Sequence, residues 1–265
     1  MKELLIYRTL TEKTSTQEKI LLLLSELRIM TTKQLLNFLT LDGSIIYDKV
    51  TYALRQLHKS NLIVSFKPEY SREKAYYLTI EGAGLIDSAY PVANDPIFNL
   101  SHYLAINDSI AEVIQITRQL SNFYSIESEQ RTWLERHEGK VFKQSQMYNI
   151  PDFTLNFLNP NGMYYFEVEL TAKTKHRYIQ EVLPRYLQLL AHFNNREVFY
   201  ICGTSHIYQL ITEALNLIKN QRQVEFETII FERFHVWYEA TFKETYNNYI
   251  QSKKERTNNE NNLFL

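Results

Sequence analysis

The stretch "PDFTLNFLNPNGMYYFEVEL", residues 151–170, contains three carboxylates that two neighbouring strands could bring together. Asp152 precedes one apolar run, and Glu167 and Glu169 lie two residues apart in the next. Because side chains alternate along a strand, Glu167 and Glu169 are predicted to share one face. Carboxylates so arranged can hold Mg²⁺ and activate water for DNA cleavage, usually beside a lysine such as Lys173. The candidate catalytic residues are therefore Asp152, Glu167, Glu169 and Lys173, with Asp152 and Glu167 as candidate metal ligands.

A second interpretation of the same residues involves no metal. A Pro-Asp pair before an apolar strand is common turn chemistry. Glu167 and Glu169 could then form ion pairs with Lys173, Lys175 or Arg177 on an exposed face of the sheet. The residue types and spacing allow both interpretations.

Residues 15–86 have the pattern of three helices followed by a hairpin. Helices are predicted at about 16–30, in "KQLLNFL" after a threonine cap, and from a Ser44 cap to about residue 59. The strands are "NLIVSF" and "AYYLTI", joined by the charged turn "KPEYSREK". On the third helix, helical spacing predicts one buried face made of Ile46, Val50, Ala53, Leu54 and Leu57. This order is typical of a winged helix-turn-helix domain.

In a winged helix, the third helix enters the major groove of DNA and the hairpin tip lies along neighbouring phosphates. The candidate groove residues are Ser44, Tyr47, Lys49, Thr51, Tyr52 and Arg55, and the candidate tip residues are Lys67, Arg72 and Lys74. Residues 1–86 contain 12 Lys and Arg against 9 Asp and Glu, whereas the remainder contains 17 against 21. The basic end therefore favours contact with phosphates, although binding to a protein remains an alternative.

The rest of the chain alternates helices and strands. Helices are predicted at 100–120, about 173–193 and about 205–220, and strands at 153–158, 163–170, 197–203 and in "ETIIFERF", 227–234. Interleaved strands and helices indicate a mixed sheet flanked by helices. The fold class is therefore α+β or α/β. We predict a DNA-binding domain over 1–90, an α/β domain over 91–250 and a disordered tail over 251–265.

The second domain, with "PDFTL" and "FEVEL" on successive strands, resembles the PD-(D/E)xK nuclease fold. Together with the winged helix it resembles the replication-relaxation family of plasmids and other mobile elements. Further segments that carry this resemblance are "SHYLAIND", Trp133 with Glu135, and "LPRYLQLL" before "EVFYICG". The resemblance implies a DNA-binding protein that acts at an origin or transfer site, in replication, relaxation or conjugation. Glu169 stands where the nuclease motif has lysine, which favours a degenerate nuclease fold without catalysis.

Composition excludes several other classes. The longest aliphatic run, residues 20–24, is too short to span a membrane, and the charged first ten residues do not match a signal peptide. The single cysteine, Cys202, excludes an internal disulfide and a cysteine zinc cluster. The seven histidines show no His-x-x-x-His spacing, and there is no glycine-rich phosphate loop. We therefore expect a cytoplasmic protein without a cofactor, unless an active nuclease site binds Mg²⁺.

The expected partner is double-stranded DNA, bound by a homodimer whose interface lies on helix 100–120 or 205–220. A relaxase or a replication initiator is a candidate protein partner. Two other function classes remain open from the sequence: a metal-dependent DNA endonuclease, and a transcriptional regulator with a C-terminal dimerisation domain.

Overall fold

The computed structural model describes residues 14–40, 46–68, 73–92, 99–117, 120, 122–137, 150–158, 161–221 and 227–262. The chain forms two compact units that interleave along the sequence. Unit 1 comprises Met1–Ala111 and Ser125–Phe142, and unit 2 comprises Glu112–Tyr124 and Lys143–Leu265. The predicted domain boundary near residue 90 therefore differs from the observed division, because α5 (Leu100–Thr117) begins in unit 1 and later residues return to it.

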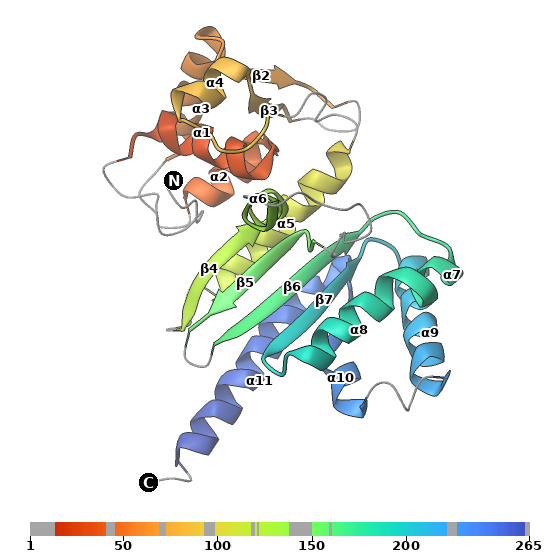
Figure 1. The fold of residues 1–265 in the computed structure, drawn as a ribbon. Helices are drawn as coiled ribbons and strands as arrows, with labels where there is room; N and C mark the ends of the chain where they lie inside the picture. The colour runs from red at the N-terminus through yellow and green to blue at the C-terminus, as the bar shows by residue number, and fades with distance from the viewer. Residues whose placement is uncertain are drawn as a thin grey trace. The chain divides into compact units, whose positions relative to one another are not determined.

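Unit 1 contains the three helices and the hairpin expected of residues 15–86, with one additional short strand (Figure 1). Its elements are α1 (Thr16–Leu27), β1 (Ile29–Thr31), α2 (Thr32–Leu39), α3 (Tyr47–Lys59), β2 (Ile63–Phe66), β3 (Ala75–Leu78) and α4 (Ile80–Leu85). The strands form an antiparallel sheet in the order β1-β3-β2. The first helix ends three residues earlier than predicted, because Arg28 adopts a φ of 65° and the chain then enters β1.

Side-chain caps explain where several of these helices begin. Ser15 Oγ accepts a hydrogen bond of 3.1 Å from the Glu18 amide at the start of α1. Thr31 and Gln34 form a reciprocal capping box at the start of α2.

Gly82 of α4 lies so close to the Leu62 carbonyl that a Cβ at this position would overlap it, so glycine is required for α4 to pack there.

The α3 helix buries the stripe that its sequence predicts, except at its first turn. Val50, Ala53, Leu54 and Leu57 are at most 3% exposed. Ile46, which was predicted to lie on the same face, is 59% exposed. The reason is that Ile46 is the N-cap residue, with φ −100° and ψ 157°, so it does not follow the helical rotation. The N-cap of α3 is thus Ile46 and not Ser44, which lies outside the described residues.

The part of α5 that belongs to unit 1 is held by buried polar contacts. Asn107 Nδ2 donates to the carbonyl of Ile29 at 2.7 Å. Gln34 Nε2 donates to the Leu104 carbonyl at 2.8 Å and to Asp108 Oδ1 at 2.9 Å. Unit 1 also contains α6 (Glu129–His137), where Gln130 Nε2 donates to the carbonyls of α1 at Ser25 and Glu26.

Four strands of unit 2 belong to a mixed sheet, as the alternation of strands and helices predicted, and the remaining strand begins in unit 2 and continues into the segment assigned to unit 1. The strand order is β4 (Phe123–Ser128), β5 (Phe153–Phe157), β6 (Gly162–Glu169), β7 (Arg196–Cys202) and β8 (Phe234–Tyr238). β5 pairs with β6 antiparallel, whereas β6, β7 and β8 run parallel. Consecutive side chains of β6 and β7 therefore point to opposite faces, and each face has its own helices.

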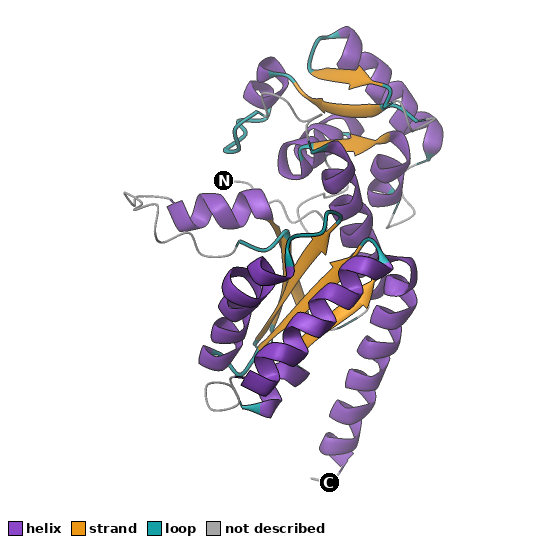
Figure 2. Ribbon diagram, turned by 90° about the vertical axis from the view of Figure 1, so that its right-hand side faces the viewer, coloured by secondary structure: helices purple, strands orange, loops and turns teal. Residues whose placement is uncertain are grey.

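Helices α8 (Leu183–His192) and α9 (Ser205–Gln221) cover one face of this sheet, and α11 (Phe242–Asn262) lies on the other (Figures 1 and 2). Tyr165, Val198 and Tyr200 pack in the cluster formed with α8 and α9. On the other face, the rings of Phe166 and Phe199 contact Tyr246 of α11. None of the described helices is long and apolar enough to cross a membrane.

Three local predictions in unit 2 were wrong. The segment 227–234, predicted as a strand, forms α10 (Thr228–Glu232) and the strand begins only at Phe234. The helix predicted over 173–193 is divided into α7 (Lys175–Arg177), a π-helical turn (Tyr178–Val182) and α8. The segment after residue 250, predicted as a disordered tail, continues α11 to Asn262, and its Lys253 is held by an ion pair with Glu197 of β7.

Candidate functional site

The outward side of α3 carries the candidate groove residues in an accessible position. Tyr47 is 59% exposed and Tyr52 is 62% exposed, and Lys49 and Arg55 are also exposed. Thr51 is half-buried and its hydroxyl donates to the Asp48 carbonyl at 3.1 Å. In the part of the chain that the structure describes, no hydrogen bond or ion pair engages the side chains of Lys49 and Arg55. Both cations are therefore available to an external partner.

The hairpin of β2 and β3 brings the predicted tip residues to one end of unit 1. The paired residues run from Ile63 with Leu78 to Phe66 with Ala75, so Lys67 and Lys74 directly follow and precede the last pair. Both lysines are exposed. Arg72, the third predicted tip residue, lies outside the described residues. The hairpin thus places two cations on opposite sides of its tip.

In unit 2, the register of β5 and β6 brings Asp152 opposite the first of the two glutamates. Phe153 pairs with Phe166, so Asp152 and Glu167 occupy the next positions along the two strands. Asp152 is buried, and its Oδ2 accepts a hydrogen bond of 2.7 Å from the Val168 amide. One carboxylate oxygen of Asp152 is thus used to hold the backbone of β6.

Glu167 and Glu169 lie on the α8 and α9 face, where each meets a tyrosine hydroxyl. Tyr186 of α8 donates a hydrogen bond to Glu167 Oε1. Tyr200 of β7 donates to Glu169 Oε2 at 2.9 Å. Burial raises the pKa of the Tyr200 hydroxyl, and the negative charges of Glu167 and Glu169 raise it further. Tyr200 therefore stays protonated and acts as a hydrogen-bond donor.

Lys173 reaches the same glutamate and so connects the following loop to β6. Its ammonium forms an ion pair with Glu169 Oε2, and its backbone amide donates to the Tyr178 hydroxyl at 3.1 Å. Lys175 and Arg177 pair elsewhere, with Glu213 and Glu181. Of the three cations predicted as partners for the glutamates, the structure thus shows Lys173 in that role.

The single cysteine lies beside this group of carboxylates. Cys202, at the end of β7, is fully buried and is paired in register with Glu169. Burial raises the pKa of the Cys202 thiol to about 12, with a further contribution from the charge of Glu169. The thiol is therefore protonated and unreactive at neutral pH.

The described residues include no group of three or more His, Cys, Asp or Glu side chains that could hold a metal ion. The proposed ligands Asp152 and Glu167 occupy neighbouring positions, but Glu169 interacts with Lys173 and Tyr200. The arrangement holds three strands and a loop together through charge-assisted hydrogen bonds. Whether Asp152 and Glu167 bind a metal stays a prediction.

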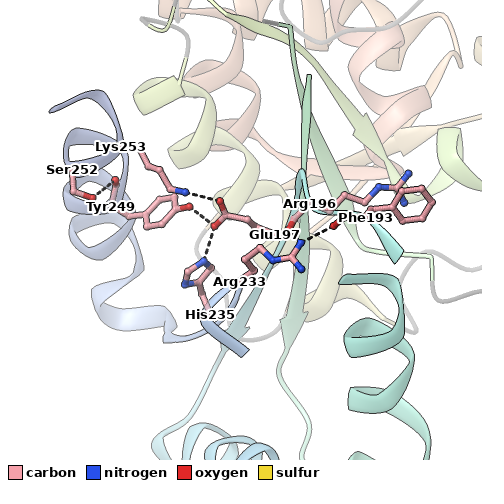
Figure 3. A network of polar contacts seen from close by, with 8 residues as sticks. All are labelled: Phe193, Arg196, Glu197, Arg233, His235, Tyr249, Ser252 and Lys253. Carbon is pink, nitrogen blue, oxygen red and sulfur yellow. Dashed lines mark hydrogen bonds and ion pairs between the residues drawn. The ribbon is translucent and has the colours of Figure 1, made fainter. Parts of the chain in front are cut away.

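Sequence reasoning missed a second carboxylate network, on the opposite face of the sheet (Figure 3). Glu197 of β7 accepts from Lys253 Nζ at 2.9 Å through Oε1, and its Oε2 lies 2.7 Å from His235 Nε2. The Tyr249 hydroxyl also donates to Oε2. Burial alone would raise the pKa of Glu197, but the hydrogen bonds from His235, Lys253 and Tyr249 outweigh burial and lower it to about 2.

The only sequence signal for this network was the spacing of Tyr249 and Lys253, which places them one helical turn apart. Because Lys253 falls in the tail that was predicted to be disordered, this spacing did not indicate a helix. Arg233 connects the end of α8 to the start of β7. It donates to the carbonyls of Leu190 at 2.7 Å and of Arg196 at 3.4 Å, and to the carbonyl of Phe193 at 2.6 Å, which Figure 3 shows.

Comparison with known proteins gives one match. A model of the family described as replication-relaxation matches residues 21–201, which is more than half of the chain and includes residues of both units. No curated protein and no solved structure matches the chain. The match includes α3, the hairpin, and the strands that carry Asp152, Glu167 and Glu169. The chain belongs to the replication-relaxation family.

Proposed function

We propose that the chain binds duplex DNA through a winged helix-turn-helix in unit 1 and acts at an origin or transfer site of a plasmid or other mobile element. Membership of the replication-relaxation family indicates a role in the replication or relaxation of such elements. The observation that carries the proposal is the outward side of α3, where Lys49 and Arg55 are exposed beside two exposed tyrosines.

The element order supports this proposal. Three helices and a three-stranded antiparallel sheet occur in the sequence α1-β1-α2-α3-β2-β3. In a winged helix of this order, α3 enters the major groove and the hairpin tip follows the adjacent phosphates. Lys67 and Lys74 at the tip would then make contacts that depend little on base sequence, whereas Arg55 could read a guanine edge.

The test is fluorescence anisotropy of the full-length chain with labelled duplex DNA over a series of salt concentrations. Phosphate contacts release counterions, so we expect the affinity to fall steeply between about 50 and 200 mM salt. Arg55→Ala should weaken binding to the preferred site by about 1–3 kcal/mol. Lys74→Ala should weaken binding to all duplexes alike and reduce the salt slope by about one.

Arg177→Ala is a matched control, because Arg177 is an exposed cation of unit 2 whose ion pair partner, Glu181, is also exposed. Exposed pairs of this kind contribute little to stability, so the variant should fold and bind DNA normally. A folded wild-type chain without salt-dependent affinity for DNA would refute the proposal and favour a winged helix that binds protein.

We further propose that the chain binds DNA as a homodimer, with a relaxase or a replication initiator as a candidate partner at the same site. A single winged helix covers little DNA, and dimers match sites with inverted repeats. The apolar stripes of the helices first predicted as the interface are buried within the chain, with Ile110 of α5 and Ile211 of α9 fully buried. The interface would therefore use another surface. Light scattering of the DNA complex at micromolar concentration should give the mass of two chains plus the duplex, and the mass of one chain plus the duplex would contradict the dimer.

A nuclease is the weaker candidate. The positions of Asp152 and Glu167 on neighbouring strands keep it open, but Glu169 stands where such a site needs a lysine and is paired with Lys173. We therefore propose a nuclease-like fold that serves binding or assembly and does not cleave DNA.

A further inference from the structure

The first two turns of α3 expose apolar atoms that no part of the described protein covers. Ile46, Tyr47 and Tyr52 are 59%, 59% and 62% exposed; the two tyrosines lie on the helix proposed to enter the major groove, and Ile46 is its N-cap residue. Isolated apolar residues on a surface are common, but three exposed apolar side chains within seven residues, interspersed with the exposed Asp48 and Lys49, are a local concentration. Such a surface indicates a partner that offers apolar groups of its own.

The side chain of Thr51 adds a methyl group to this surface. Its hydroxyl already donates to the Asp48 carbonyl at 3.1 Å, within the helix. This hydrogen bond uses the only donor of the threonine side chain. Thr51 can then offer a base its methyl group, or its hydroxyl oxygen as an acceptor.

The polar residues of α3 restrict which bases it can read by hydrogen bonds. Adenine is normally read by the two hydrogen bonds of an Asn or Gln amide, and guanine by Arg or Lys. The helix contains no Asn, and its one Gln, Gln56, is half-buried. Lys49 and Arg55 can read guanine. Hydroxyl groups can also bond to either base of an A·T pair, and the 5-methyl group of thymine, the one apolar group in the major groove, is what exposed apolar side chains can contact.

Resting on the proposed function, we propose that α3 recognises thymine 5-methyl groups through Ile46, Tyr47, Thr51 and Tyr52, with Arg55 reading a guanine in the same site. The cations of the helix hold it against the negatively charged DNA, and the apolar side chains select the sequence. The DNA class is thus a duplex site in which thymines and at least one guanine face a single recognition helix.

The experiment starts with duplexes that the full-length chain selects from a pool with a randomised central segment. The selected duplex is then remade with deoxyuridine in place of thymine at one position at a time, which removes only the 5-methyl group. At two or more positions we expect the affinity to fall about fourfold, the effect of burying one methyl group. Affinity unchanged at every position would overturn this inference, while salt-dependent binding would leave the proposed function intact. Failure to select any duplex would overturn both.

Ile46→Ala tests the protein side of the contact. In this variant the difference between thymine and deoxyuridine should disappear at one position and persist at the others. Ile80→Ala is the matched control, because Ile80 is 77% exposed but lies on α4 and not on the helix proposed to contact the bases. Discrimination retained at every position in Ile46→Ala, or lost equally in Ile80→Ala, would show that the apolar surface of α3 does not read thymine.

Discussion

Glu169 and Glu197 sit on opposite faces of the same sheet, and their partners come from different distances along the chain. Glu169 is paired with Lys173, four residues away, and with Tyr200 of the neighbouring strand. Glu197 gathers His235, Tyr249 and Lys253, which lie 38, 52 and 56 residues further on. The first network joins neighbouring strands and the loop after β6, whereas the second attaches the C-terminal helix to β7. A short motif can therefore be conspicuous in sequence while a network of longer range, which attaches a whole helix, has no comparable motif.

The largest effect should come from removing Glu197. In Glu197→Ala, three donors lose their acceptor and α11 loses its polar attachment to β7, so we expect a destabilisation of about 3–5 kcal/mol. Glu169→Ala should cost less, about 1–3 kcal/mol, because its donors Lys173, Tyr178 and Tyr200 lie on a loop, a turn and a strand that β6 and its neighbours hold by other contacts. Urea denaturation followed by circular dichroism measures both. An equal or larger effect for Glu169→Ala would reverse this ranking of the two networks.

The next largest expected effect is on the stability of the protein at acidic pH. The pKa of Glu197 is lowered from 4.5 to about 2, so the folded state favours the charged carboxylate. This contribution, about 3 kcal/mol, is fully present above pH 4.5 and is lost as the pH falls towards 2. The stability difference between the wild type and Glu197→Gln should therefore shrink across this window in urea titrations at several pH values. A difference that does not change between pH 6 and 3 would show that Glu197 is not held in its charged form.

The smallest expected effect is on DNA cleavage. Supercoiled plasmid carrying the selected site should not be nicked in Mg²⁺ or Mn²⁺, because Glu169 is paired with Lys173 and Glu167 receives a hydrogen bond from Tyr186. Asp152→Ala and Glu167→Ala should leave DNA affinity unchanged. Metal-dependent nicking in the wild type that both substitutions abolish would establish a nuclease and turn the Glu167 and Glu169 network into an active site.

Local patterns predicted the fold well where neighbours in sequence are also neighbours in space. The buried stripe of α3 from Val50 to Leu57 follows helical spacing, and the alternation of β6 correctly placed Glu167 and Glu169 on one face. The prediction that Ile46 is buried was wrong because Ile46 is the N-cap residue, whose backbone does not follow the helical rotation. The prediction of a disordered tail was wrong because the polar composition of this segment resembles disorder. The segment is attached through the ion pair of Lys253 with Glu197, which lies far away in the sequence.

The same reasoning explains what could be predicted of the candidate site. The pairing of Lys173 with Glu169 is one of the ion pairs that the sequence predicts as the alternative to a metal site. The tyrosines that donate hydrogen bonds to the two glutamates come from β7 and α8, and no recognisable sequence motif surrounds them. Their role depends on strand register and helix packing, which a single sequence does not reveal.

The buried thiol of Cys202 has a practical consequence. It is the only cysteine of the chain, it is inaccessible, and its raised pKa keeps it protonated. A maleimide or other thiol reagent can therefore label Cys202 only when the sheet opens. The labelling rate under native conditions then measures how often unit 2 opens. For the same reason, a cysteine introduced on the exposed side of α3 would be the single reactive thiol of the folded protein, ready for attaching a dye or a DNA crosslinker without removing the natural one.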